Sequence, residues 1–319
     1  MTITRRHFTG ALLGTTAASI LPAQAQQGAF INILTGGTSG VYYPMGVALS
    51  KIYSQSIAGS RPSVQATKAS VENLVLLQSG KGEIAFTLGD SLAFAWAGDE
   101  EAGFKGKLDR LRGLCAIYPN FIQIVASKES GIKTLADLKG KRLSVGAPKS
   151  GTELNARAIL SGAGMTYKDL GKVEYLPFAE SVDLIKNRQL DATLQSAGLG
   201  VAAIRDLAAS LEINVVEVPG SLVDKIGAPY VKAVIPANTY TGQTQDVQAA
   251  AVVNYLVTRS NLSDDIAYQM VKGVFEQRDD LIASHQAARD IKIENALQGM
   301  PVPLHPGAEK YFREKGIKK

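Results

Sequence analysis

The stretch FINILTGGTSGVYYP, residues 30–44, decides the fold. Its first five residues form a short apolar run typical of a buried strand, and the glycines after it permit a tight turn. Proline is favoured in the first turn of a helix, so Pro44 marks the start of one. Strand, turn and helix in this order form the unit from which α/β proteins are built.

The same unit recurs along the chain. Strands are predicted at Ser63–Lys68, Ile84–Leu88, Arg142–Ala147, Val173–Leu176, Asp191–Gln195 and Ile213–Val218. Helices are predicted to start at Ser70, as a capping residue, and at Asp90, and to cover Gly151–Ala163, Ala179–Arg188 and Val201–Ala209. This repetition predicts an α/β fold with a mostly parallel sheet.

Two long extended runs divide this pattern into two α/β lobes. Leu111–Ser127 leaves the first lobe, and Tyr230–Ile235 is predicted to return to it. We therefore expect a first lobe of residues 26–116 and 231–319 and an inserted second lobe of residues 117–230, joined by hinge crossings around a ligand cleft. The last part should be helical, at Asp246–Thr258, Ser263–Gln277, Ala287–Gln298 and Pro306–Lys315.

Residues 1–25 have the features of a cleavable export signal. Arg5 and Arg6 precede the weakly apolar run Phe8–Leu21, and Ala23-Gln24-Ala25 is a small-x-small cleavage site. The arginine pair resembles a twin-arginine signal, and an ordinary Sec signal remains the alternative. No later run approaches 18 apolar residues, so we expect a released periplasmic protein without stable membrane insertion.

Composition excludes several classes of protein. The net charge is +5, of which Arg5 and Arg6 supply two. The sequence lacks the clustered basic residues that would predict nucleic-acid binding. The single cysteine, Cys115, excludes an internal disulfide and is expected in the core. The three histidines lack metal-ligand spacing, so neither a metal nor a cofactor is expected.

Two strand-to-helix loops are candidates for anion binding, because the free N–H groups at a helix N-terminus attract negative charge. The first loop offers Gly37, Thr38, Ser39, Tyr42 and Tyr43 as candidate ligand contacts. The second offers Ser150, Gly151 and Thr152, where Ser150 and Glu153 also fit a capping box. A cap uses only some of the free N–H groups, so capping and binding are compatible.

Weaker candidates are Asp90, Tyr118, Gln195 and Ser196, for which a turn, a helix cap or core packing is the simpler explanation. No Ser/His/Asp set or pair of catalytic carboxylates emerges. The sequence therefore favours a binding protein over an exported enzyme.

Three motifs resemble the TAXI family, the solute receptors of TRAP (tripartite ATP-independent periplasmic) transporters. They are TGGTSGVYYPMG at residues 35–46, DLKGKRLSVGA at residues 137–147 and KSGTELNARAIL at residues 149–160. Where relatives often have Ser-Asp after the third strand, this chain has Gly89-Asp90. No arginine is plainly placed to grip a carboxylate.

The resemblance implies a periplasmic-binding-protein type II-like fold and a glutamate-like, glutamine-like or dicarboxylate ligand. It implies a membrane partner with fused small and large permease subunits, driven by an ion gradient. We expect a monomer. A ligand-sensing module for a signalling receptor is the main alternative.

The cleavage site predicts that the mature protein begins at or near Gln26. Intact-mass analysis of the exported protein tests this. A mature species that retains Arg5 and Arg6 would contradict it.

Overall fold

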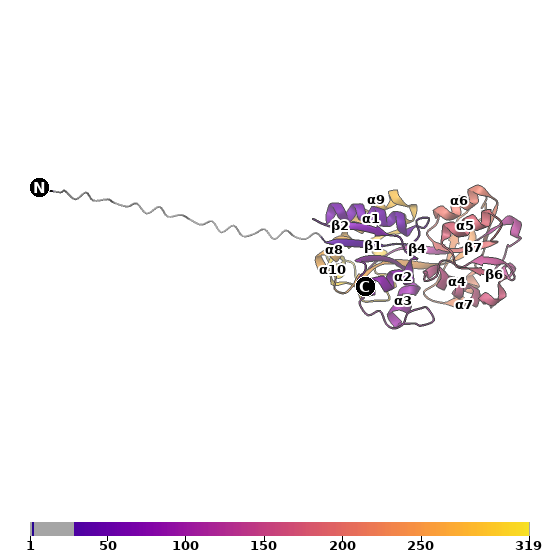
Figure 1. Ribbon diagram of the computed structural model, residues 1–319, viewed down its shortest axis with the longest axis horizontal. Helices are drawn as coiled ribbons and strands as arrows, with labels where there is room; N and C mark the ends of the chain where they lie inside the picture. Colours follow the sequence, from indigo (N-terminus) through magenta and orange to yellow (C-terminus); the bar gives the residue numbers. More distant parts are fainter. Residues whose placement is uncertain (1, 3–28, 319) are drawn as a thin grey trace.

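The computed structural model describes residue 2 and residues 29–318, so the predicted export signal lies outside the described residues. The chain forms two lobes that share one ten-stranded sheet (Figure 1). The strand order is β2-β1-β3-β10-β4-β7-β5-β6, with β8 paired to β4 and β9 paired to β10. Within residues 29–318, no helix has the length and apolar character needed to cross a membrane.

The first lobe contains three strands that run parallel, β1 (Phe30–Leu34), β2 (Arg61–Gln65) and β3 (Ile84–Leu88). Its helices are α1 (Tyr42–Ser56), α2 (Ser70–Gln78), α3 (Gly89–Ala97), α8 (Asp264–Glu276), α9 (Arg278–Ser284) and α10 (Pro306–Glu314). Pro44 lies in the first turn of α1, as predicted.

The second lobe has its own parallel group, β5 (Arg142–Ser144), β6 (Lys172–Glu174) and β7 (Ala192–Ala197). The short strands β8 (Ile213–Val216) and β9 (Val231–Ile235) extend the sheet. Its helices are α4 (Gly151–Gly162), α5 (Phe178–Lys186), α6 (Ala202–Ser210) and α7 (Gly220–Ile226).

Two long antiparallel strands join the lobes, β4 (Leu111–Ser127) and β10 (Val247–Arg259). The start of β10 pairs with β9, and its later part pairs with β3 of the first lobe. Because β4 and β10 run against their neighbours, the sheet is mixed rather than mostly parallel.

Three sequence predictions were wrong in this framework. The predicted helix Asp246–Thr258 is strand β10, which pairs with β9 at its start and with β3 further along. The predicted helix Ala287–Gln298 is two short 3-10 turns, separated where buried Ile291 is extended. Ser70 is the first residue of α2 and its hydroxyl accepts the Leu88 N–H (3.1 Å), whereas Ala69 is the N-cap.

Asn254 on β10 is a fully buried polar residue in the core of the junction. Its Nδ2 donates to the carbonyl of Tyr118 (2.8 Å) and to Oδ1 of Asn120 (2.7 Å), both on β4. Its Oδ1 accepts the hydroxyl of Tyr42 on α1. This one amide therefore ties both crossing strands to the first helix.

We predict that Asn254→Ala lowers the free energy of unfolding by about 1–3 kcal/mol, because three buried partners lose a hydrogen bond. Urea denaturation measures the change. The exposed Asn187→Ala is the control and should stay within about 0.5 kcal/mol of the parent. Equal stability of the two variants would show that Asn254 is not a structural hub.

Candidate ligand-binding site

A cavity of about 130 Å³ lies between the lobes. The first lobe and β4 line it with Gly36, Gly37, Gly40, Val41, Tyr42, Thr67, Lys68, Ala69, Ser70, Leu88 and Asn120. The second lobe lines it with Ala147, Ser150, Gly151, Thr152, Pro177, Phe178, Ser196 and Ala197. The lining is mainly apolar, with hydroxyl and amide groups at intervals.

Five helices begin at this cavity. The N-cap residues of α1 to α5 are among the lining residues: Val41, Ala69, Leu88, Ser150 and Pro177. The first N–H groups of a helix have no intrahelical partner, and its N-terminus carries a partial positive charge of about half a unit. The cavity wall therefore favours negative charge, although it contains few charged side chains.

The structure brings together half of the predicted site residues. Six line the cavity: Gly37, Tyr42, Ser150, Gly151, Thr152 and Ser196. The other six lie elsewhere: Thr38, Ser39, Tyr43, Asp90, Tyr118 and Gln195.

Ser150 caps α4 as predicted, because its Oγ accepts the N–H of Glu153 at 3.2 Å. The reciprocal half of the predicted capping box is not formed. The carboxylate of Glu153 instead accepts hydrogen bonds from Arg157 Nε (2.8 Å) and the Tyr167 hydroxyl (2.9 Å). The cap takes the N–H of Glu153, which leaves the first N–H groups of α4 to other acceptors.

Tyr42 contributes its ring to the cavity. The ring stacks on Phe86 with centroids 5.0 Å apart, and the hydroxyl donates a hydrogen bond to Asn254 Oδ1. Burial raises the pKa of Tyr42 far above its usual value, so the side chain stays neutral.

Asp90 lies behind the cavity wall in a buried polar network. Its Oδ2 accepts from Asn155 Nδ2 (2.5 Å) and the Tyr230 hydroxyl (2.7 Å), and its Oδ1 accepts the Ser91 N–H (2.6 Å). The Ser196 hydroxyl donates to Asn155 Oδ1 (2.6 Å), which links the network to the cavity. Burial raises the pKa of Asp90 despite these hydrogen bonds.

Tyr118 and Gln195 are buried away from the cavity. The Tyr118 hydroxyl and both polar atoms of the Gln195 side chain have no hydrogen-bond partner among the described residues. Cys115 is a buried free thiol, as expected.

Sequence reasoning did not name most of the lining residues, among them Lys68, Phe178 and Asn120. Lys68 precedes α2, Phe178 begins α5, and Asn120 lies on β4, where its Nδ2 donates to the carbonyl of Ser196 (3.0 Å). Lys68 and Phe178 each follow a strand and stand within two residues of a helix start, as the predicted loops do. That position in the strand–helix unit was the signal that could have found them.

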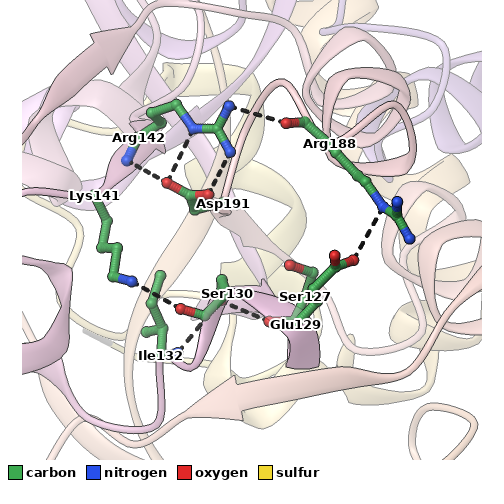
Figure 2. A network of polar contacts seen from close by, with 8 residues as sticks. All are labelled: Ser127, Glu129, Ser130, Ile132, Lys141, Arg142, Arg188 and Asp191. Carbon is green, nitrogen blue, oxygen red and sulfur yellow. Dashed lines mark hydrogen bonds and ion pairs between the residues drawn. The ribbon is translucent and has the colours of Figure 1, made fainter.

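A larger hollow of about 700 Å³ lies at the far end of the second lobe, where β4 ends and β5 and β7 begin. Figure 2 shows two ion pairs there, Arg142 with Asp191 (2.6 Å) and Arg188 with Glu129 (3.1 Å), while Lys141 donates to the carbonyl of Ser130 (2.8 Å). Hydrogen bonds from Arg142 lower the pKa of Asp191. Ligands of open parallel sheets bind at the carboxyl ends of the strands, so this opposite end is the weaker candidate.

No group of three or more His, Cys, Asp or Glu side chains suited to a metal ion occurs within the described part of the chain. His305 is the N-cap of α10, where its Nδ1 accepts the Gly307 N–H (3.2 Å). His285 accepts the Ala287 N–H (3.1 Å) in the same way.

Several of the solved structures similar to this chain are described as solute-binding or transporter proteins. The alkanesulfonate-binding protein of Xanthomonas axonopodis pv. citri, bound to MOPS, is 16% identical with a TM-score of 0.51, and the match covers 91% of this chain and 85% of that one. A putative L-cystine ABC transporter protein of Listeria monocytogenes is 15% identical with a TM-score of 0.52, covering 83% and 98%.

The binding protein component of an ABC phosphonate transporter of Pseudomonas aeruginosa is 13% identical with a TM-score of 0.53, covering 83% and 80% of the two chains. At these identities the likeness shows the fold alone. It is the α/β fold of periplasmic solute-binding proteins, with a two-lobed type II-like arrangement, as the sequence predicted.

The family comparison is more direct, because the model of the NMT1-like family matches residues 33–316. That match includes all residues that line the cavity. The chain belongs to the NMT1-like family.

Proposed function

We propose that this protein is a periplasmic receptor that captures a small organic anion between its lobes and delivers it to a membrane permease. The observation that carries this proposal is the convergence of five helix N-termini on one cavity between two lobes. Similar solved structures are described as binding proteins for sulfonates and as components of a phosphonate transporter, which are also anion systems.

The finer assignment follows from the TAXI motifs. We propose a receptor of a TRAP transporter with fused small and large permease subunits, acting as a monomer and driven by an ion gradient. The glutamate-like, glutamine-like and dicarboxylate ligands implied by those motifs are the starting candidates for a ligand screen.

Contacts between the lobes support capture by closure. The N–H of Glu72 at the start of α2 donates to the carbonyl of Lys149 in the second lobe (3.1 Å). Arg157 on α4 donates to the carbonyl of Glu101 in the first lobe (2.8 Å). Asp90 and Asn155 also come from opposite lobes. The structure is therefore a form in which the lobes touch, and release of a ligand requires these contacts to break.

Two glycines on opposite sides of the cavity provide a matched test of closure. A Cβ on Gly151 would lie 2.7 Å from Ser70 Oγ and 2.8 Å from Ser91 Oγ, both in the first lobe. A Cβ on Gly37 would meet no atom within 4 Å. We predict that Gly151→Ala holds the lobes apart and Gly37→Ala does not.

Solution scattering and calorimetry measure the effect with the best ligand from a thermal-shift screen of small metabolites. At saturating ligand, Gly151→Ala should keep a larger radius of gyration and bind at least about tenfold more weakly than Gly37→Ala. The proposed function is wrong if no small organic solute stabilises the parent protein. Equal compaction of both variants would contradict the closure mechanism alone.

The raised pKa of Asp90 predicts how stability depends on pH. The folded protein holds this proton at pH values where the unfolded chain, with an ordinary pKa of about 3.9, has lost it. The contribution of Asp90 to the free energy of unfolding is fully present below the unfolded pKa and is lost as the pH rises through the raised pKa of the folded protein. Relative to Asp90→Asn, the parent should therefore lose stability as the pH rises from about 4.

Urea denaturation across this pH range measures the difference between the two proteins. Asp137→Asn is the control with the opposite sign, because backbone hydrogen bonds lower the pKa of Asp137. The free energy of unfolding of the parent minus that of Asp137→Asn should shrink as the pH falls. A pH-independent difference for Asp90→Asn would show that this carboxyl titrates normally.

A further inference from the structure

We infer that the ligand is a small amine-free monoanion, such as a short oxo acid or another monocarboxylate, and that Lys68 selects its single charge. The inference rests on the proposed function and narrows it. It departs from the glutamate-like ligand that the sequence motifs imply.

Lys68 is the only charged residue among the described residues that line the cavity. The loop that carries it is held by a hydrogen bond from the N–H of Lys68 to Glu72 Oε2 (2.6 Å). Its side chain is exposed at the edge of the cavity. One cation beside several helix N-termini matches one anionic group on the ligand.

An ammonium group would find no charged partner there. The described lining contains no Asp or Glu. The carboxylate of Asp90 lies outside the lining and already accepts hydrogen bonds from Asn155, Tyr230 and Ser91. Glu72 also lies outside it and accepts the N–H of Lys68. Hydroxyls and amides can bind an ammonium but do not neutralise it, and the positive helix ends oppose it.

A second carboxylate is equally poorly matched. Much of the remaining wall is apolar, with Val41, Leu88, Pro177 and Phe178. A second carboxylate would find no charged side chain to pair with on this part of the wall, where only the partial charges of the helix ends are available to it. The cavity of about 130 Å³ is also smaller than the roughly 300–1,000 Å³ typical of pockets for drug-sized ligands. A compact apolar body with one carboxylate fits both features.

Matched pairs of probes measure separately how an amine and how a second carboxylate change the affinity. Calorimetry on the whole mature protein would compare pyruvate with alanine, the oxo acid of leucine with leucine, and oxoglutarate with glutamate, within a wider thermal-shift panel of small carboxylic acids. We expect the tightest probe to be a monocarboxylate without an amine, and its amino-acid partner to bind at least about tenfold more weakly.

Lys68→Gln should weaken binding of that probe about five- to tenfold and reduce its salt dependence, whereas Lys68→Arg should retain most of the affinity. The control is Lys81→Gln, an exposed lysine beyond the other end of α2. Equal affinities of Lys68→Gln and Lys81→Gln would overturn the role of Lys68.

Tightest binding by an amino acid or a dicarboxylate would overturn the monoanion inference while leaving the proposed receptor function intact. Failure of every organic solute in the panel to stabilise the protein would instead overturn the receptor function, and the inference with it.

Discussion

The direction of the first five helices is the constraint on which the site depends. In each lobe the parallel strands end at the same edge of the sheet, so the helices that follow them begin there. Their N-caps meet around one cavity, and the partial charges of their free N–H groups add. The backbone thereby makes the cavity attractive to an anion, and only one charged side chain, Lys68, is found in its described lining.

The shared sheet determines how the two lobes can move. Strands β4 and β10 pair along most of their length, with register shifts at Val253/Tyr255 and Leu256/Val257, and pass from one lobe to the other, so this strand pair keeps the lobes connected. Closure of the lobes then changes the contacts around the cavity and leaves the pairing of β4 with β10 in place. The network of Asp90, Asn155 and Ser196 crosses this boundary and reaches the cavity wall through the Ser196 hydroxyl. We propose that ligand contact with Ser196 and contact between the lobes stabilise each other.

The strand–helix units could be predicted from the sequence because each apolar run ends in a turn and a helix start. The loops that carry Gly37, Ser150, Gly151 and Thr152 were predicted for this reason, and these four residues line the cavity. Strand β10 could not be predicted from the sequence, because the segment VQAAAVVNYLVTR is apolar almost throughout and lacks the alternation of a half-buried strand. Alanine favours helix locally, and pairing with β3, β4 and β9 overrides that preference. Thr38 and Ser39 do not line the cavity, and spacing alone does not say which side of a loop faces it.

A crystal structure of the protein with its tightest carboxylate ligand tests whether helix N-termini of both lobes hold the anion. The account predicts closed lobes, with carboxylate oxygens about 2.7–3.2 Å from backbone N–H groups in the first turn of α4 and of a first-lobe helix. A carboxylate bound in the distal hollow beside Arg142 and Arg188, or held by one lobe with the cavity open, would contradict the account.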